Sequence, residues 1–180
     1  NSIAEPGYGV FTDILSPEVQ RDLIQLMDDK LAADKLVRAG VGAGHETQVR
    51  SEIRSDSIIW LDRSDPTPIV ETWLNGMNDL NEHFRRYLFL SVWSYEGHLA
   101  HYPGGGFYKA HLDRHSQTQA RQLSIITYLN NDWEESDGGQ LRLYTDQELG
   151  VKGPFIDVLP KAGTVVIFRS GDFWHEVLPS

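Results

Sequence analysis

The stretch HYPGGGFYKAHLD, residues 101–113, holds a proline and three glycines and ends in His-x-Asp. A phosphate-binding loop needs its glycines between a strand and a helix N-terminus, with a Lys-Ser/Thr pair after them. Here the glycines lead into residues 107–111, a run typical of a strand, and no such pair follows. We therefore interpret the glycines as a tight reversal between two strands. Residues two apart on a strand point the same way, so His111 and Asp113 share one face.

An imidazole and a carboxylate on one face provide two metal ligands. His175 is the candidate for the third, because it follows the β-rich run TVVIF and stands among aromatic residues in FWHEV. Two histidines and one carboxylate form the facial triad of non-haem Fe(II) oxygenases, whereas zinc usually takes a fourth ligand or a water. Taken alone, the pattern leaves open a surface pair of His111 and Asp113 with a hydrogen-bonded core histidine at 175. Weaker signals surround the other histidines, His45, His83, His98, His101 and His115.

The composition is that of a soluble globular domain. The 180 residues are 40% hydrophobic and 23% charged, and no apolar run approaches the roughly 18 residues of a membrane span. The absence of cysteine excludes disulfides, zinc ribbons, iron–sulfur clusters and thiol catalysis, and fits a cytoplasmic protein. A net charge of −10 argues against a nucleic-acid partner. Basic residues nevertheless recur at Arg50, Arg54, Arg114 and Arg121. We expect a monomer without membrane contacts.

Two amphipathic helices are predicted before residue 88, each covering a sheet. Ser16-Pro17-Glu18 is a helix start, and the region that follows it is expected to end at Gly40. The second pattern follows Asp65-Pro66 and runs at helical spacing from Val70 to Tyr87. Between them, residues 37–56 are rich in glycine and charge. We expect this segment to form a mobile flap or a long hairpin over one face, with Asp56 paired to Arg121 at its base.

Short β-rich runs dominate the chain after residue 88. They cover residues 89–95, 98–102, 121–129, 140–144, 154–159 and 163–169, and turn signals separate them. Many short strands at regular spacing favour a barrel or sandwich. The sequence therefore predicts one α+β domain, with helices and flap over about 1–88 and an antiparallel jelly-roll core over about 89–180.

Five ordered motifs resemble the 2-oxoglutarate- and Fe(II)-dependent prolyl hydroxylases. They are IRSDSIIWLD (53–62), HYPGGGFYKAHLD (101–113), RQLSIITYLNNDW (121–133), DGGQLRLY (137–144) and FWHEVLP (173–179). The resemblance is strongest to the prolyl hydroxylase domain group, whose animal members act as oxygen sensors and which has bacterial relatives. It covers about residues 50–180 and implies a double-stranded β-helix, the cupin-like jelly roll.

The resemblance also implies roles for residues at matching positions. His111, Asp113 and His175 become the ligands of Fe(II), and 2-oxoglutarate and O₂ become co-substrates, with ascorbate as a supporting reductant. Tyr102 and Tyr128 fall where the family lines the co-substrate pocket. The candidate substrate-binding residues are Arg54, Asp56, Arg121 and Trp174. From the residues alone, both tyrosines fit core packing and Arg121 fits a solvated charge.

The function implied by the resemblance is hydroxylation of a prolyl residue in a protein, giving hydroxyproline, succinate and CO₂. For bacterial members the candidate protein is elongation factor Tu. Two alternatives remain open: an oxygenase acting on a small molecule or nucleic acid, and a non-catalytic metal-binding cupin. The net charge of −10 argues against nucleic acid.

One departure from the family pattern concerns the far carboxylate of 2-oxoglutarate. The family binds it with an Arg or Lys on the strand after the distal histidine, and this sequence stops at Ser180. We expect the natural chain to continue with that strand. Within the sequence, Lys109, Arg142 and Arg169 are poor substitutes.

Overall fold

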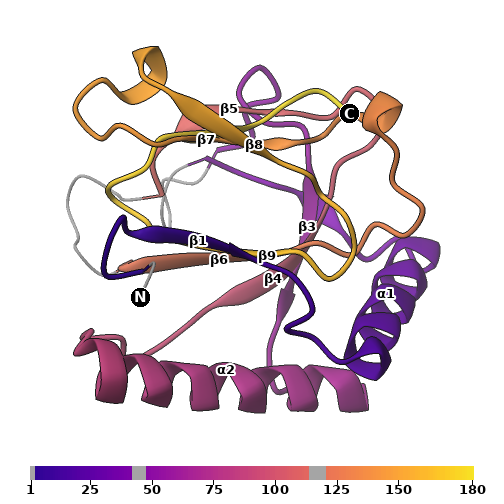
Figure 1. The fold of residues 1–180 in the computed structure, drawn as a ribbon. Helices are drawn as coiled ribbons and strands as arrows, with labels where there is room; N and C mark the ends of the chain where they lie inside the picture. Colours follow the sequence, from indigo (N-terminus) through magenta and orange to yellow (C-terminus); the bar gives the residue numbers. More distant parts are fainter. Residues whose placement is uncertain (1–2, 42–47, 114–120) are drawn as a thin grey trace.

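The computed structural model describes residues 3–41, 48–113 and 121–180. Within these ranges, two helices flank a stack of antiparallel sheets (Figure 1). The helices are α1 (Pro17–Ala32) and α2 (Pro68–Leu88). The strands are β1 (Tyr8–Phe11), β2 (Val37–Arg38), β3 (Ser57–Leu61), β4 (Gly97–His101), β5 (Tyr108–His111), β6 (Leu123–Thr127), β7 (Leu141–Tyr144), β8 (Phe155–Val158), β9 (Val165–Arg169) and β10 (His175–Val177). Two 3-10 turns, η2 (Glu135–Asp137) and η3 (Gly150–Lys152), lie on either side of β7.

Two sheets face each other across an apolar core. One has the order β1-β9-β6 and the other, above it in Figure 1, has the order β5-β10-β7-β8. Side chains alternate along β9, as the period of two requires. Val166 and Phe168 point into the core between the sheets, where they meet Leu141 of β7. Val165 and Ile167 belong to a separate cluster on the outer face of the same sheet.

Helix α2 covers that outer face. Phe84 of α2 is buried with Val165 and Ile167 of β9. The third sheet has the order β2-β3-β4, and there Leu26 of α1 packs with Leu99 of β4 and the first half of α2. The expectation that both helices cover sheets is confirmed. Within the described ranges, neither helix is long and apolar enough to cross a membrane.

The first helix begins where the sequence predicts but ends earlier. The hydroxyl of Ser16 accepts a hydrogen bond from the amide of Val19 at 3.3 Å and caps the helix. We predicted that the first helical region would end at Gly40. That prediction is wrong, because the helix stops at Ala32. Asp34 takes a positive φ of 52° just beyond it, which turns the chain out of the helix and into β2.

The strand expected over residues 89–95 is not formed. Phe89 ends α2 in the left-handed conformation, with φ 53°, and residues 90–96 have no regular structure. Phe89 and Trp93 are 88% and 77% exposed, so the apolar residues that suggested a strand do not all lie on a sheet. Each of the other five predicted runs overlaps a strand.

Residues 37–56 form a long hairpin in the part that the structure describes. Val37–Arg38 pairs antiparallel with β3, and Val41 and Gln48 form an antiparallel bridge. Residues 42–47, which include His45, lie outside the described residues, as do Arg114 and His115. The predicted mobility of this segment stays a prediction.

The glycines of residues 104–106 form the predicted reversal between β4 and β5. Gly105 has a φ of +78°, and the amide of Gly106 donates to the carbonyl of Pro103 at 2.6 Å. A Cβ atom at position 106 would lie 2.6 Å from that same carbonyl oxygen, so only glycine fits. The turn also packs against Ser180, whose amide donates to the carbonyl of Gly106 at 3.0 Å.

Candidate metal centre

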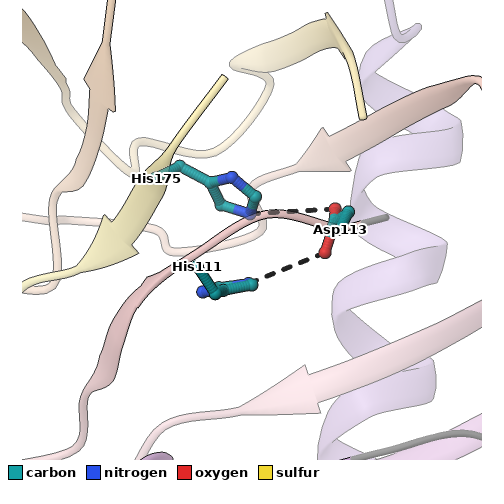
Figure 2. Close-up of side chains that lie close together, drawn as sticks. All are labelled: His111, Asp113 and His175. Carbon is teal, nitrogen blue, oxygen red and sulfur yellow. Dashed lines mark ion pairs between the residues drawn. The ribbon is translucent and has the colours of Figure 1, made fainter. Parts of the chain in front are cut away.

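His111, Asp113 and His175 meet at the point where β5 and β10 pair. His111 and His175 are register partners on these two antiparallel strands, and Asp113 follows His111 by two residues. One oxygen of Asp113 lies 3.6 Å from Nε2 of His111, and the other lies 3.7 Å from Nε2 of His175 (Figure 2). One ligand atom from each residue lies within 4.8 Å of the others, a spacing that suits a single metal ion. The predicted cluster is therefore present.

Both histidines are oriented by the backbone in the same way. Nδ1 of His111 is 2.8 Å from the carbonyl oxygen of Lys109, and Nδ1 of His175 is 3.1 Å from that of Phe173. A carbonyl only accepts, so Nδ1 carries the hydrogen in each ring and donates it. Nε2 is then left with its lone pair directed at Asp113. This is the tautomer that a metal-binding histidine needs.

The charges in the cluster also suit a cation. Burial, followed by the proximity of His111, lowers the pKa of His175 to about 4, so its ring is neutral at neutral pH. Burial alone would raise the pKa of Asp113, but its interactions with His111, His175 and Ser124 outweigh burial and hold that pKa well below the usual range. The cluster thus presents the neutral imidazole of His175 and the ionised carboxylate of Asp113 beside the ring of His111. His175 is 4% exposed and Asp113 is 23% exposed, so solvent reaches the site from the carboxylate side.

A network of hydroxyl and amide groups holds Asp113 in place. The hydroxyl of Ser124 on β6 lies 2.5 Å from Oδ2 of Asp113 and 2.8 Å from the hydroxyl of Ser170. The amide of Asp113 donates to the carbonyl of Ser170 at 3.2 Å. These contacts tie the carboxylate of one sheet to two residues of the facing sheet.

A stack of side chains supports His111 from the other side. The ring of Tyr108 lies parallel to that of His111, with centroids 3.6 Å apart, and the guanidinium of Arg54 lies 4.3 Å from the centre of the Tyr108 ring. Arg54 also donates two hydrogen bonds to the fully buried carboxylate of Asp56. The predicted pairing of Asp56 with Arg121 is therefore wrong. Arg54 is only two residues from Asp56 and fills the position instead.

Comparisons with known proteins agree with this geometry. Residues 97–180 match the family model of the 2OG-Fe(II) oxygenase superfamily. A prolyl-4-hydroxylase from Pseudomonas putida is similar over 99% of this chain and 88% of its own, with 34% identity and a TM-score of 0.86. The chain is a 2OG-Fe(II) oxygenase of the prolyl hydroxylase type. Membership of this family implies Fe(II), 2-oxoglutarate and O₂ as metal and co-substrates.

Animal relatives of this oxygenase are longer proteins. The hypoxia-inducible factor prolyl hydroxylase of Caenorhabditis elegans is 31% identical over 136 residues, which are 71% of this chain and 18% of that protein. The human Egl nine homolog 1 is 31% identical over 137 residues, or 72% of this chain and 30% of that protein. The oxygenase thus spans less than a third of either relative.

The predicted co-substrate tyrosines lie in neighbouring positions. Burial and then Asp56 raise the pKa of Tyr102, Arg54 opposes them by lowering it, and Tyr128 adds a smaller increase. Burial also raises the pKa of Tyr128, which packs against the core between the sheets. Both phenols therefore stay neutral and can donate hydrogen bonds.

Two predicted substrate-binding residues differ in their surroundings. Arg121 pairs with Glu96, and its Nη1 lies 3.8 Å from Oδ1 of Asp113, at the solvent side of the cluster. Trp174 does not join the cluster, because its indole ring lies against Gly150 of η3. Glu176, beside the distal histidine, accepts a hydrogen bond from the Tyr144 hydroxyl at 2.6 Å.

Two of the three basic residues considered as partners for the far carboxylate of 2-oxoglutarate are already paired with aspartates. Arg142 makes two hydrogen bonds of 2.8 Å to Asp157, and Arg169 pairs with Asp172 at 2.7 Å. Lys109 is exposed on β5.

Three residues of the oxygenase site were missed by sequence reasoning: Tyr108, Ser124 and Ser170. Tyr108 stands three residues before His111 and was visible as part of the quoted motif, although its stacking was not. Ser124 has the same parity on β6 as the inward-facing Ile126, and Ser170 has the same parity as Phe168. The signal available in the sequence was a serine at a strand position whose alternation predicts a buried apolar side chain.

Proposed function

We propose that this oxygenase hydroxylates a prolyl residue in an exposed loop of a protein. The observation that carries the proposal is the cluster of His111, Asp113 and His175, with both Nε2 atoms directed at the carboxylate. The similarity to a bacterial prolyl-4-hydroxylase, at 34% identity, supports proline as the target. Elongation factor Tu is the candidate protein that we would test first.

We assign the three residues of the cluster as the ligands of Fe(II). A facial triad leaves three coordination positions free, and there Fe(II) with 2-oxoglutarate and O₂ supplies the oxidising chemistry. The protein contributes orientation: two backbone carbonyls fix the imidazoles, and Ser124 fixes the carboxylate. The low exposure of His175 limits the access of water to the distal side.

We assign the walls of the pocket to residues around the cluster. Tyr102 and Tyr128 line the co-substrate side with neutral hydroxyl donors. Arg54 and Asp56 shape the substrate side, with Arg54 also donating to the carbonyl of Gly40 at 3.3 Å and so joining residues 37–56 to β5. Arg121, next to Asp113, is the exposed cation that meets the protein substrate. Trp174 supports this region only through its contact with η3.

We infer that residues 37–56 are a flap that orders over the substrate loop. Its base is fixed by a hydrogen bond of 2.7 Å from Arg38 to the carbonyl of Ser55, in addition to the contact between Arg54 and Gly40. Hydrogen exchange with and without substrate protein tests this inference. Amides of the flap should become protected on binding, and equal protection in both states would contradict it.

We infer that the two facing sheets are the halves of a double-stranded β-helix. On this interpretation, residues 1–180 work as one dioxygenase domain, with helical support and flap over about 1–88 and the core over about 89–180. The antiparallel pairing of all named strands supports it. We also propose a cytoplasmic monomer, consistent with a chain that lacks cysteine.

Incubation with elongation factor Tu tests the function. The purified chain is supplied with Fe(II), 2-oxoglutarate, ascorbate and air, and the factor is then digested and analysed by mass spectrometry. One proline should gain one oxygen atom, with stoichiometric succinate, and the Asp113→Ala variant should give neither. Succinate released without oxygen in any protein residue would keep the dioxygenase and overturn the proposed substrate class.

A further inference from the structure

We propose that Ser124 and Ser170 form a hydroxyl relay that makes Asp113 present a single oxygen to the metal. The two serines are positioning residues, since they act through Asp113. This inference rests on the proposed role of Asp113 as a ligand, and its test separates the two ideas.

Both serines are buried in a place where strand parity predicts apolar side chains. Ser124 is 8% exposed and Ser170 is 0% exposed. Ser124 lies opposite Phe168 on the β6–β9 ladder, and the amide of Ser170 donates to the carbonyl of Gln122 at 3.0 Å. A buried hydroxyl without a partner destabilises a fold. Two of them side by side at the edge of an apolar core therefore need an explanation, and Asp113 provides it.

Counting hydrogens gives the relay a direction. A ligand carboxylate only accepts hydrogen bonds, so the one hydroxyl hydrogen of Ser124 is donated to Oδ2 of Asp113, at 2.5 Å. Ser124 then has no hydrogen left for Ser170, which lies 2.8 Å away. Ser170 must donate to Ser124. The chain of hydrogen bonds therefore runs from Ser170 through Ser124 to the carboxylate, and each bond strengthens the next.

The two oxygens of Asp113 are consequently different. Oδ2 receives a short, charge-assisted hydrogen bond, which removes electron density from it and fixes the plane of the carboxylate. Oδ1 lies 3.6 Å from Nε2 of His111 and 3.8 Å from Nη1 of Arg121, both beyond hydrogen-bond length. Oδ2 faces Nε2 of His175 at 3.7 Å but accepts the hydrogen bond from Ser124, so Oδ1 is the oxygen left free as a ligand. A carboxylate free to turn would offer both oxygens and occupy a position that the co-substrates need.

Metal affinity and metal spectra test the relay without requiring the enzyme to turn over. Removing a group that orients a ligand typically weakens metal binding 10–100-fold. We expect Ser124→Ala to weaken Mn(II) binding about tenfold in a titration followed by electron paramagnetic resonance, and to change the Co(II) absorption spectrum. Ser124→Thr, which keeps the hydroxyl, should restore both. Ser170→Ala keeps its backbone contact with Asp113 and loses only the outer hydroxyl, so the expected loss is roughly threefold.

Ser64→Ala is the matched control, because the Ser64 hydroxyl also donates to an aspartate, Asp62, outside the cluster. It should leave Mn(II) affinity and the Co(II) spectrum unchanged. Wild-type affinity and spectrum in both Ser124→Ala and Ser170→Ala would overturn the relay. If Ser124→Ala does not fold, Ser170→Ala with wild-type Mn(II) affinity overturns it alone. Failure of the wild-type chain to bind Mn(II) would instead contradict the ligand assignment itself.

Discussion

The space between the two facing sheets has an apolar end and a polar end, and β9 together with the residue that follows it contributes to both. Phe168 of β9 is fully buried among Leu141, Leu143 and Val166, while Ser170, two residues further on, is fully buried next to Ser124 and Asp113. The apolar end removes hydrocarbon from water and stabilises the fold. The polar end buries hydroxyl, imidazole and carboxylate groups, which costs free energy unless each one has a partner. The difference separates the residues that hold the fold from those that hold the metal.

The largest effect is expected at the polar end, on turnover. Replacement of His175 by Ala removes one of three ligand atoms and should abolish succinate release. The free energy of unfolding should fall by about 1–3 kcal/mol, because the buried carbonyl of Phe173 loses its donor. Coupled turnover assays and chemical denaturation measure the two quantities. His83→Ala, an exposed histidine on α2, is the control and should keep its activity. Activity retained by His175→Ala would contradict the assignment of the polar end to metal binding.

Breaking the buried ion pair beside the site should be the largest change in stability. Arg54→Met leaves the carboxylate of Asp56, which is 1% exposed, without its cation, and should lower the free energy of unfolding by about 4 kcal/mol. The double variant Arg54→Met/Asp56→Leu removes both charges and should regain most of that loss. Denaturation curves of the single and double variants measure the two free energies of unfolding. Equal losses of stability in both variants would show that packing, rather than charge, stabilises this region.

Truncation at the apolar end should affect stability alone. Leu141 is fully buried in the core between the sheets, and Leu141→Ala should lower the free energy of unfolding by about 3 kcal/mol through lost transfer energy and a cavity. Mn(II) affinity of the folded variant should stay within twofold of wild type. A tenfold loss of Mn(II) affinity would mean that the two ends are mechanically coupled.

The smallest effect concerns acid stability, far from both ends. Lys30, followed by Thr67, lowers the pKa of Asp65 from its usual 3.8 to about 2, and the side chains of Lys30 and Asp65 are 16% and 13% exposed. Because the folded-state pKa is depressed, the stabilisation is complete above about pH 4 and is lost as the pH falls toward 2. It amounts to about 2 kcal/mol at most. Unfolding curves of wild type and Asp65→Asn should converge over that interval, and parallel curves would contradict the prediction.

Local rules predicted the parts of this fold that depend on neighbours in sequence. The Ser16 cap, the glycine turn and the strand within residues 163–169 each follow from residues next to one another, and each is confirmed. The strand at 89–95 failed because Phe89 adopts the left-handed conformation and leaves the chain without a partner strand. A run of apolar residues does not reveal whether a neighbouring strand exists for it.

The sequence predicted the metal ligands of the site but not the residues that position them. Strand parity placed His111 and Asp113 together, and the ordered motifs added His175, which the register of β5 and β10 brings opposite His111. The contacts of Ser124 with Asp113 and Ser170 depend on which side chains meet across sheets, and spacing along one strand does not contain that information. The partner of Asp56 was missed for another reason: Arg54 has the same strand parity two residues away, and only the distant Arg121 was considered.

The metal content of four purified proteins tests the central claim most directly. Wild type and the single variants His111→Ala, Asp113→Ala and His175→Ala are loaded with Mn(II), an inert substitute for Fe(II), desalted and analysed by elemental mass spectrometry, with folding checked by circular dichroism. The proposed ligand set predicts about one Mn(II) per wild-type chain and less than about a tenth of that in each folded variant. Wild-type occupancy in all three variants would contradict the assignment of the metal to these residues.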